Sequence, residues 1–203
     1  MIEDSYKTIM RPTEGLYKEK GSKFLAYAYP ISQDSDISEH LAELRKKHHD
    51  ARHHCYAYIL GMENPKSRAN DDGEPGHSAG DPILGQIRSY GLVNVLVVVV
   101  RYFGGTKLGV GGLISAYKTA ASEALSLVKS MEVYPEKQFV ILFGYDETAS
   151  VERILNQFEI KWRDRTYIDI CEFRGTMRKS DYTLFEEKII ELRVDSISLT
   201  VQK

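Results

Sequence analysis

Apolar and polar positions along residues 1–134 follow two periods, one typical of strands and one typical of helices. Residues 15–29 alternate between two faces around a turn at Lys20-Gly21, which predicts a strand hairpin. Residues 36–48 repeat apolar positions every three or four residues and predict an amphipathic helix. Further strands are expected at residues 54–60 and 92–100. Because the second of these is almost entirely apolar and rich in valine, we expect it to be covered on both faces, at the centre of its sheet.

The segments that connect these strands have other patterns. Residues 61–80 are polar and rich in turn formers with no apolar period, which predicts a long loop. A short helix is expected over residues 82–90, with Pro82 in its first turn. Beyond the glycine-rich stretch 101–112, apolar side chains at helical spacing predict a helix of about five turns. These side chains are Leu113, Tyr117, Ala120, Ala124 and Val128.

A domain boundary is expected between residues 134 and 135, because Pro135 cannot continue a helix. The elements expected beyond it are a strand (139–143), a helix (148–158), two strands (160–165 and 167–173), a helix (181–192) and a strand (196–201). The order βαββαβ is typical of a ferredoxin-like split βαβ fold. We therefore expect an α+β protein with two domains, 1–134 and 135–203.

Composition and charge exclude several classes of protein. The 203 residues are 42% hydrophobic and 28% charged, which is unlike a disordered chain. The net charge of −2 argues against a surface built wholly for nucleic acid, and nothing indicates specificity for DNA. Two cysteines, Cys55 and Cys171, fit a reducing compartment. The longest apolar run, residues 95–100, is far shorter than the roughly 20 residues that cross a bilayer, so we expect a cytoplasmic protein without membrane contact.

The first candidate site is the stretch 101–112, between the buried strand and the long helix. Glycines let the backbone turn sharply and approach a ligand closely, and the helix start beyond them offers unpaired N–H groups to phosphates, carboxylates or a nucleic-acid backbone. The residues expected to make these contacts are Arg101, Tyr102, Gly104, Gly105, Lys107, Gly109, Gly111 and Gly112. The spacing matches neither a Walker A loop nor a dinucleotide-binding glycine motif. The alternative is a tight structural turn that lets strand and helix pack closely.

The second candidate site is the polar loop 71–80. Two aspartates, a glutamate and a histidine lie within seven residues and could transfer protons or hold a cation. They are Asp71, Asp72, Glu74 and His77. EF-hand spacing is absent. The alternative is an ordinary polar loop with turn residues at Asp72-Gly73 and Pro75-Gly76.

The third candidate site is the basic run 45–55, which could contact RNA phosphates. Its candidate residues are Arg45, Lys46, Lys47, Arg52 and His53. The histidines and Cys55 do not have zinc spacing, and strand alternation sends His54 and Cys55 to opposite faces. We therefore expect no metal and no cofactor. The alternative is a solvated helix end, where the helix dipole favours basic side chains.

Two motifs within these candidates resemble the YigZ/IMPACT family. One is Asp71-Asp-Gly-Glu-Pro with Ser78-Ala-Gly80 and Pro82-Ile-Leu84. The other, which is highly specific, is a buried strand that runs into Arg101-Tyr-Phe-Gly-Gly-Thr-Lys-Leu-Gly109. The resemblance covers essentially the whole chain. One departure is His77, where the family pattern usually has glycine.

This resemblance implies both a fold and a cellular process. It implies a first domain with a ribosomal-protein-type fold, like the second domain of a small-subunit ribosomal protein, and a second domain like the ferredoxin-like last domain of the translocation elongation factor. It implies a role in translation, because the eukaryotic members of the family are translational regulators. No settled activity is implied for the bacterial members.

Two functions from different classes are therefore expected. The first is a non-catalytic, translation-associated regulator that binds RNA, the ribosome or a translation factor through the 101–112 turn and the basic run. The second is an enzyme for a small phosphate or carboxylate substrate, in which the 71–80 loop folds over the turn while Arg101 and Lys107 hold the anion. A closed cavity where the loop carboxylates meet the turn would favour the enzyme, and an open basic face would favour the regulator.

Overall fold

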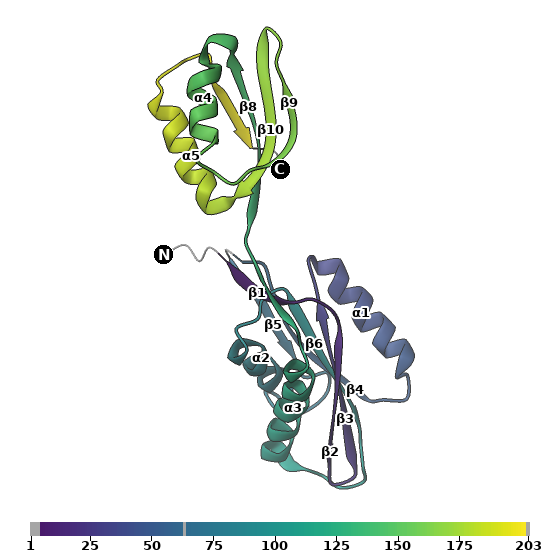
Figure 1. Ribbon diagram of the computed structural model, residues 1–203. Coiled ribbons are helices and arrows are strands. Elements are labelled where there is room, and N and C mark those ends of the chain that lie inside the picture. The colour runs from purple at the N-terminus through teal and green to yellow at the C-terminus, as the bar shows by residue number, and fades with distance from the viewer. Residues whose placement is uncertain (1–4, 63, 202–203) are drawn as a thin grey trace. The chain divides into compact units, whose positions relative to one another are not determined.

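The computed structural model describes residues 5–62 and 64–201, and the chain forms two compact units (Figure 1). The first is built from residues 6–133, and the second contains residue 134 onward. The sequence had placed the boundary one residue later. No helix among the described residues is long and apolar enough to cross a membrane.

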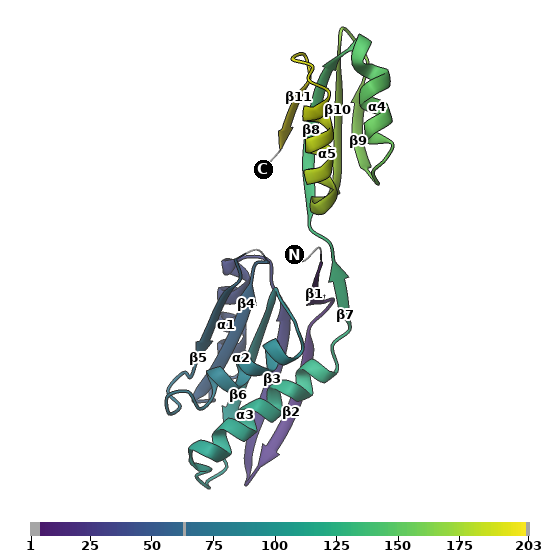
Figure 2. The same ribbon diagram turned by 90° about the vertical axis from the view of Figure 1, so that its left-hand side faces the viewer.

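The first unit is a five-stranded antiparallel sheet with helices on both faces. The strand order is β2 (Thr13–Glu19), β3 (Ser22–Pro30), β6 (Val95–Tyr102), β4 (His53–Leu60) and β5 (Lys66–Asn70). Helix α1 (Asp34–Lys47) covers one face, and helices α2 (Gly80–Ser89) and α3 (Gly109–Ser126) cover the other (Figures 1 and 2). The apolar strand β6 is central, as its composition predicted.

Strand β6 supplies side chains to two separate cores. Val95, Val97 and Val99 pack with α2 and α3, whereas Leu96, Val98 and Val100 pack beneath α1. Each fully buried aliphatic side chain of this kind contributes about 1.5–3 kcal/mol. The same alternation sends Arg101 toward the α2 and α3 face and Tyr102 toward the α1 face.

Two features of the first unit differ from the sequence prediction. The expected loop 61–80 contains β5, which pairs with β4 at the edge of the sheet. Its residues Lys66–Asn70 are exposed or half-buried and lack an apolar period because an edge strand is held by backbone hydrogen bonds. Strands β1 (Tyr6–Ile9) and β7 (Ser130–Val133) also form an unpredicted two-stranded sheet.

The second unit has the predicted element order βαββαβ. Its elements are β8 (Glu136–Gly144), the short 3-10 helix η1 (Tyr145–Glu147), α4 (Thr148–Leu155), β9 (Lys161–Thr166), β10 (Ile170–Arg178), α5 (Lys179–Glu191) and β11 (Ser198–Val201). The antiparallel strands lie in the order β11-β8-β10-β9. The strand expected at 167–173 begins and ends later, because alternation of buried residues continues through Met177. The protein is a mixed α and β structure with antiparallel sheets.

Candidate functional site

Strand pairing brings the basic run and the glycine-rich turn together. In the register of β4 and β6, His53 lies opposite Arg101. A cavity of about 410 Å³, here called the anion cavity, lies beside this pair. Its lining combines three segments of sequence: Arg52, His53, Glu74, Pro75, Arg101, Phe103, Lys107, Leu108, Gly109, Val110 and Leu113. Two residues of the 71–80 loop, Glu74 and Pro75, therefore lie beside the turn.

A buried ion pair anchors this loop. Arg101 Nη1 lies 2.6 Å from Glu74 Oε1, and the two side chains are only 7% and 4% exposed. The Tyr117 hydroxyl donates to the same carboxylate oxygen at 2.7 Å. The Cys55 thiol lies 3.3 Å from that hydroxyl, and burial raises the pKa of both groups well above their ordinary values. These contacts tie together the loop, β4, β6 and α3.

Arg101 keeps one donor free within this arrangement. Its Nε is buried and has no hydrogen-bond partner among the described residues. The guanidinium carbon lies 5.5 Å from the centroid of the Phe24 ring and 5.6 Å from that of Phe103. This N–H is therefore enclosed by the protein and is a buried donor without a protein acceptor among the described residues.

Helix α3 begins at the cavity without a side-chain cap. Leu108 occupies the N-cap position and makes no cap hydrogen bond, and the first turn holds no acidic residue. Gly109 has a φ of +69°, a backbone conformation that favours glycine. Gly109, Val110 and Gly111 are exposed, so N–H groups at the positive end of the helix dipole face solvent.

The five glycines of the turn serve different purposes. A Cβ on Gly104 would lie 1.9 Å from the carbonyl carbon of Gly21, and the Gly104 N–H donates to Ser22 Oγ at 3.1 Å. Gly104 is therefore a packing glycine, and a Cβ on Gly112 would lie 3.0 Å from Leu108 Cβ. Added Cβ atoms on Gly105, Gly109 and Gly111 would meet nothing within 4 Å. The structural interpretation therefore applies to Gly104 and Gly112, whereas no packing constraint accounts for the other three glycines.

Only Glu74 among the four candidate acid–base residues lines the anion cavity. Asp71 accepts backbone N–H groups of His77, Ala79 and Gly80 at 2.8–2.9 Å. Burial opposes its ionisation, but these N–H groups hold the pKa of Asp71 below its ordinary value. Asp72 accepts from the His54 N–H at 2.7 Å.

His77 lies at the exposed end of the loop. It has a φ of +63°, and its Nδ1 is 2.7 Å from Asp81 Oδ2. That hydrogen bond raises the pKa of His77. The left-handed conformation explains why glycine suits this position, where the family pattern usually has it.

The basic run divides between the end of α1 and the anion cavity. Arg45, Lys46 and Lys47 form the last turn of α1, where Arg45 lies 3.6 Å from Asp72 and Lys47 lies 3.7 Å from Glu14. Arg52 and His53 line the cavity, and His53 Nδ1 bonds the Asp72 carbonyl at 2.9 Å. Within residues 5–62 and 64–201, no three His, Cys, Asp or Glu side chains come together as metal ligands.

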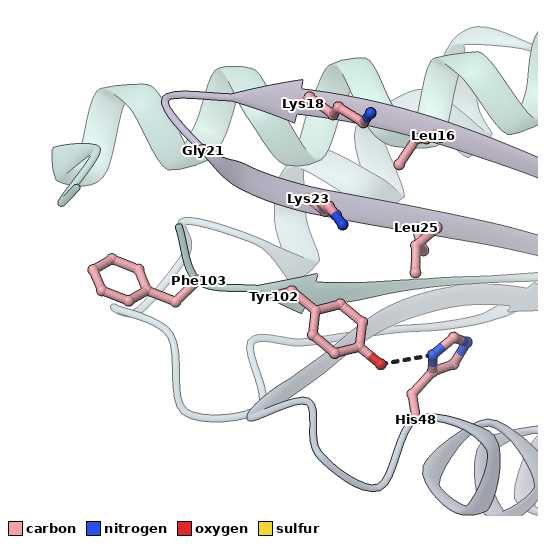
Figure 3. Close-up of a pocket in the computed structure, with 8 residues that line it drawn as sticks. All are labelled: Leu16, Lys18, Gly21, Lys23, Leu25, His48, Tyr102 and Phe103. Carbon is pink, nitrogen blue, oxygen red and sulfur yellow. Dashed lines mark hydrogen bonds between the residues drawn. The ribbon is translucent and has the colours of Figure 1, made fainter. Parts of the chain in front are cut away.

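Tyr102 lines a different cavity, on the α1 face of the sheet. This cavity of about 500 Å³, here called the hairpin cavity, lies beside the β2–β3 hairpin (Figure 3). Its lining is Leu16, Lys18, Gly21, Lys23, Leu25, His48, Tyr102 and Phe103. Sequence reasoning missed this site and also the Glu74–Tyr117 contact, since Tyr117 had been counted only as part of an apolar helix face. The signal available was one lysine on each strand of the predicted hairpin, Lys18 and Lys23, close to the turn.

Known proteins match this chain over both of its units. A family model described as the Impact N-terminal domain matches residues 20–125. The chain is 31% identical over 188 residues to IMPACT family member YvyE of Bacillus subtilis (strain 168), covering 93% of this chain and 87% of that protein. It is 31% identical over 182 residues to IMPACT family member YigZ of Escherichia coli (strain K12), covering 89% of each. A crystal structure of a hypothetical protein matches 98% of both chains with a TM-score of 0.70 and 27% identity.

Proposed function

The chain belongs to the IMPACT family, and we propose that it is a cytoplasmic, translation-associated regulator that binds RNA, free or within the ribosome, without itself catalysing a reaction. The resemblance to the eukaryotic members, which regulate translation, supports the process. The chemistry of the anion cavity supports the ligand. RNA is favoured over a translation factor as the direct ligand because the cavity is suited to phosphate.

The observation that carries this proposal is the excess of positive charge in the anion cavity. Arg52, Arg101 and Lys107 line it with His53, against the single carboxylate of Glu74. That carboxylate already neutralises Arg101, whereas Arg52 and Lys107 are exposed and form no ion pair with a described residue. The uncapped start of α3 adds about half a positive charge. A phosphate group is suited to the unpaired charges of Arg52 and Lys107 and to the start of the helix.

The basic surface extends beyond one phosphate. Asp72 contacts Arg45 through its carboxylate and His53 through its carbonyl, so the end of α1 adjoins the cavity lining. Lys46 and Lys47 lie on the same last helical turn. Positive side chains both in the cavity and at the end of α1 suit a polyanion better than an isolated small ion.

Binding of a single-stranded RNA oligonucleotide, followed by fluorescence anisotropy over a range of salt concentrations, tests the proposal. Each phosphate contact contributes a slope of about −0.7 in log affinity against log salt for single strands. The double variant Arg52→Ala/Lys107→Ala should weaken binding and reduce the slope by about 1.4. Cosedimentation with ribosomes should weaken in parallel.

Lys118→Ala is the matched control, since Lys118 is an exposed lysine on α3 away from the cavity lining. It should leave both affinity and slope nearly unchanged. Undetectable binding by the unaltered protein would overturn the proposal. If the control has the same effect per removed charge as the double variant, the proposal is also overturned, because binding would then depend only on total charge.

One observation favours the enzyme alternative. Glu74 and Pro75 do line the cavity beside Arg101 and Lys107, as acid–base chemistry on a small anion requires. However, the Glu74 carboxylate is held by Arg101 and Tyr117. Turnover of phosphate esters by the unaltered protein, abolished in Glu74→Gln, would replace the binding proposal.

We also propose a fold type for each of the two domains. The order β11-β8-β10-β9 and the βαββαβ connectivity support a ferredoxin-like fold for residues 135–203. For residues 1–134 we retain the ribosomal-protein-type interpretation that the family resemblance implies. A shared fold does not determine function, so the RNA-binding measurements above remain the test of the proposed function.

A further inference from the structure

The hairpin cavity combines apolar, aromatic and basic walls. Leu16 and Leu25 are cross-strand partners on β2 and β3, and Leu16 is 48% exposed. Tyr102 and Phe103 supply rings at the end of β6 (Figure 3), and Phe103 is 56% exposed. A volume of about 500 Å³ lies within the range of about 300–1,000 Å³ typical of ligand cavities.

Two lysines face each other directly in this cavity. Lys18 and Lys23 are partners in the β2–β3 register, both are exposed, and neither forms an ion pair with any residue that the structure describes. Like charges directly opposite on neighbouring strands destabilise a sheet. No acidic residue is in the lining. An anionic ligand would remove this repulsion.

The Tyr102 ring is held in place by a chain of hydrogen bonds. Its hydroxyl donates to Asp50 Oδ1 at 3.0 Å, so His48 Nδ1, 2.9 Å away, must be the donor to Tyr102 (Figure 3). Burial lowers the pKa of His48 and so favours the neutral ring, in which Nε2 accepts from the Tyr27 hydroxyl at 2.8 Å. A ring fixed before binding loses little conformational freedom when a ligand stacks on it.

We propose that the hairpin cavity binds a nucleobase and its neighbouring phosphate from single-stranded RNA. The base packs against Tyr102, Phe103 and the two leucines, and Lys18 with Lys23 contacts the phosphate. Aromatic side chains with adjacent lysines are a sequence-tolerant way to bind single strands. This inference rests on the proposed RNA-binding function and adds that the RNA is unpaired.

Phe103 connects the two cavities. It lines the hairpin cavity and the anion cavity alike. A strand that passes over its ring can place a base on the α1 face and an adjoining phosphate beside Lys107. Bases in a duplex are already stacked and paired, so they cannot enter the hairpin cavity.

Two probes of the same length separate the contributions of base and phosphate. One is a single-stranded RNA of about eight nucleotides that carries 2-aminopurine. The other is the same strand with its bases removed. We expect the complete strand to bind about 5- to 100-fold more tightly than the abasic strand, with quenching of 2-aminopurine fluorescence. Duplex RNA of equal charge should compete weakly.

Matched variants assign this preference to the cavity. Phe103→Leu keeps an apolar side chain and removes the ring, and it should reduce the preference for the complete strand. Tyr90→Leu removes a partly exposed ring outside both cavities and should not. Lys18→Ala/Lys23→Ala should weaken both probes and reduce the salt slope.

The outcomes distinguish the two proposals. If both probes bind equally and Arg52→Ala/Lys107→Ala still weakens them, the base site is wrong and the anion cavity stands. Because Phe103 lines both cavities, the hairpin cavity stands and the anion cavity is wrong if Lys18→Ala/Lys23→Ala weakens binding whereas Arg52→Ala/Lys107→Ala does not. If neither probe binds, both proposals are wrong.

Discussion

Removing Glu74 tests whether the Arg101–Glu74 pair is the anchor of the 71–80 loop. In Glu74→Ala, the Arg101 guanidinium stays in a position where 7% of its side chain is exposed, now without a counter-charge. The Tyr117 hydroxyl also loses its acceptor. Breaking one side of a buried ion pair costs about 3–5 kcal/mol, which is a large fraction of the roughly 5–15 kcal/mol that stabilises an ordinary domain.

Urea unfolding of the full chain measures this loss. With a slope of about 1–3 kcal/mol per molar urea, a loss of about 3–5 kcal/mol should lower the midpoint of the first unit by roughly 1–5 M. Far-UV circular dichroism follows both units, whereas fluorescence of the single tryptophan, Trp162, follows the second. The two signals together assign the shifted transition to the first unit.

Two further variants help to interpret the stability loss of Glu74→Ala. Glu14→Ala removes the partner of Lys47 in an exposed pair and should cost about 0–1 kcal/mol. Glu74→Leu/Arg101→Met replaces the buried pair with apolar side chains and should recover most of the lost stability. If Glu74→Ala costs no more than Glu14→Ala, the anchoring role assigned to Glu74 is refuted.

Three more predictions concern the loop and the turn. Asp71→Asn should destabilise the fold, because one amide oxygen replaces two carboxylate oxygens that accept three N–H groups. Since the folded pKa of Asp71 is lowered, the deficit of the variant in urea midpoint should be full above its ordinary pKa of 3.8 and shrink as pH falls through the lower folded value. Gly104→Ala should lower the thermal midpoint, because its Cβ would overlap backbone atoms at a cost of about 1–3 kcal/mol or more. Gly111→Ala should raise the midpoint, because alanine within a helix is about 0.5–1 kcal/mol more favourable than glycine and its Cβ would meet nothing within 4 Å. His77→Gly relieves a positive φ but loses the Asp81 contact, which is present below the raised pKa of His77; its gain in thermal midpoint should therefore be larger at high pH than at low pH.

Elements with strong side-chain patterns could be predicted from the sequence. The strand around residues 95–100 was recognised as central because burial on both faces demands apolar side chains at every position. The βαββαβ order of the second unit followed from a change of period between segments. Strands β1, β5 and β7 were missed. Strand β5 is held by backbone pairing at the exposed edge of the sheet, and β1 and β7 pair with each other; such backbone pairing leaves little trace in side-chain composition.

The residue types of the candidate sites could be identified along the chain, but their partners could not. Local spacing indicated that Arg101 and Lys107 follow a buried strand and precede a helix. It contained no information on the β4–β6 register, which places His53 beside Arg101. It also could not assign Glu74, whose role depends on Tyr117, 43 residues further along the chain.

The sequence by itself determined which segments are strands or helices where burial is strong, and which segments carry positive charge and glycine. Tertiary structure alone decided that Arg101 and Tyr102, neighbours in sequence, line cavities on opposite faces of one sheet. It also decided that three of the four candidate acidic-loop residues lie outside the anion cavity. The physical reason is that the spacing of apolar residues shows only which face of a helix or strand is buried. A site, by contrast, depends on strand register and on how loops bring distant segments together.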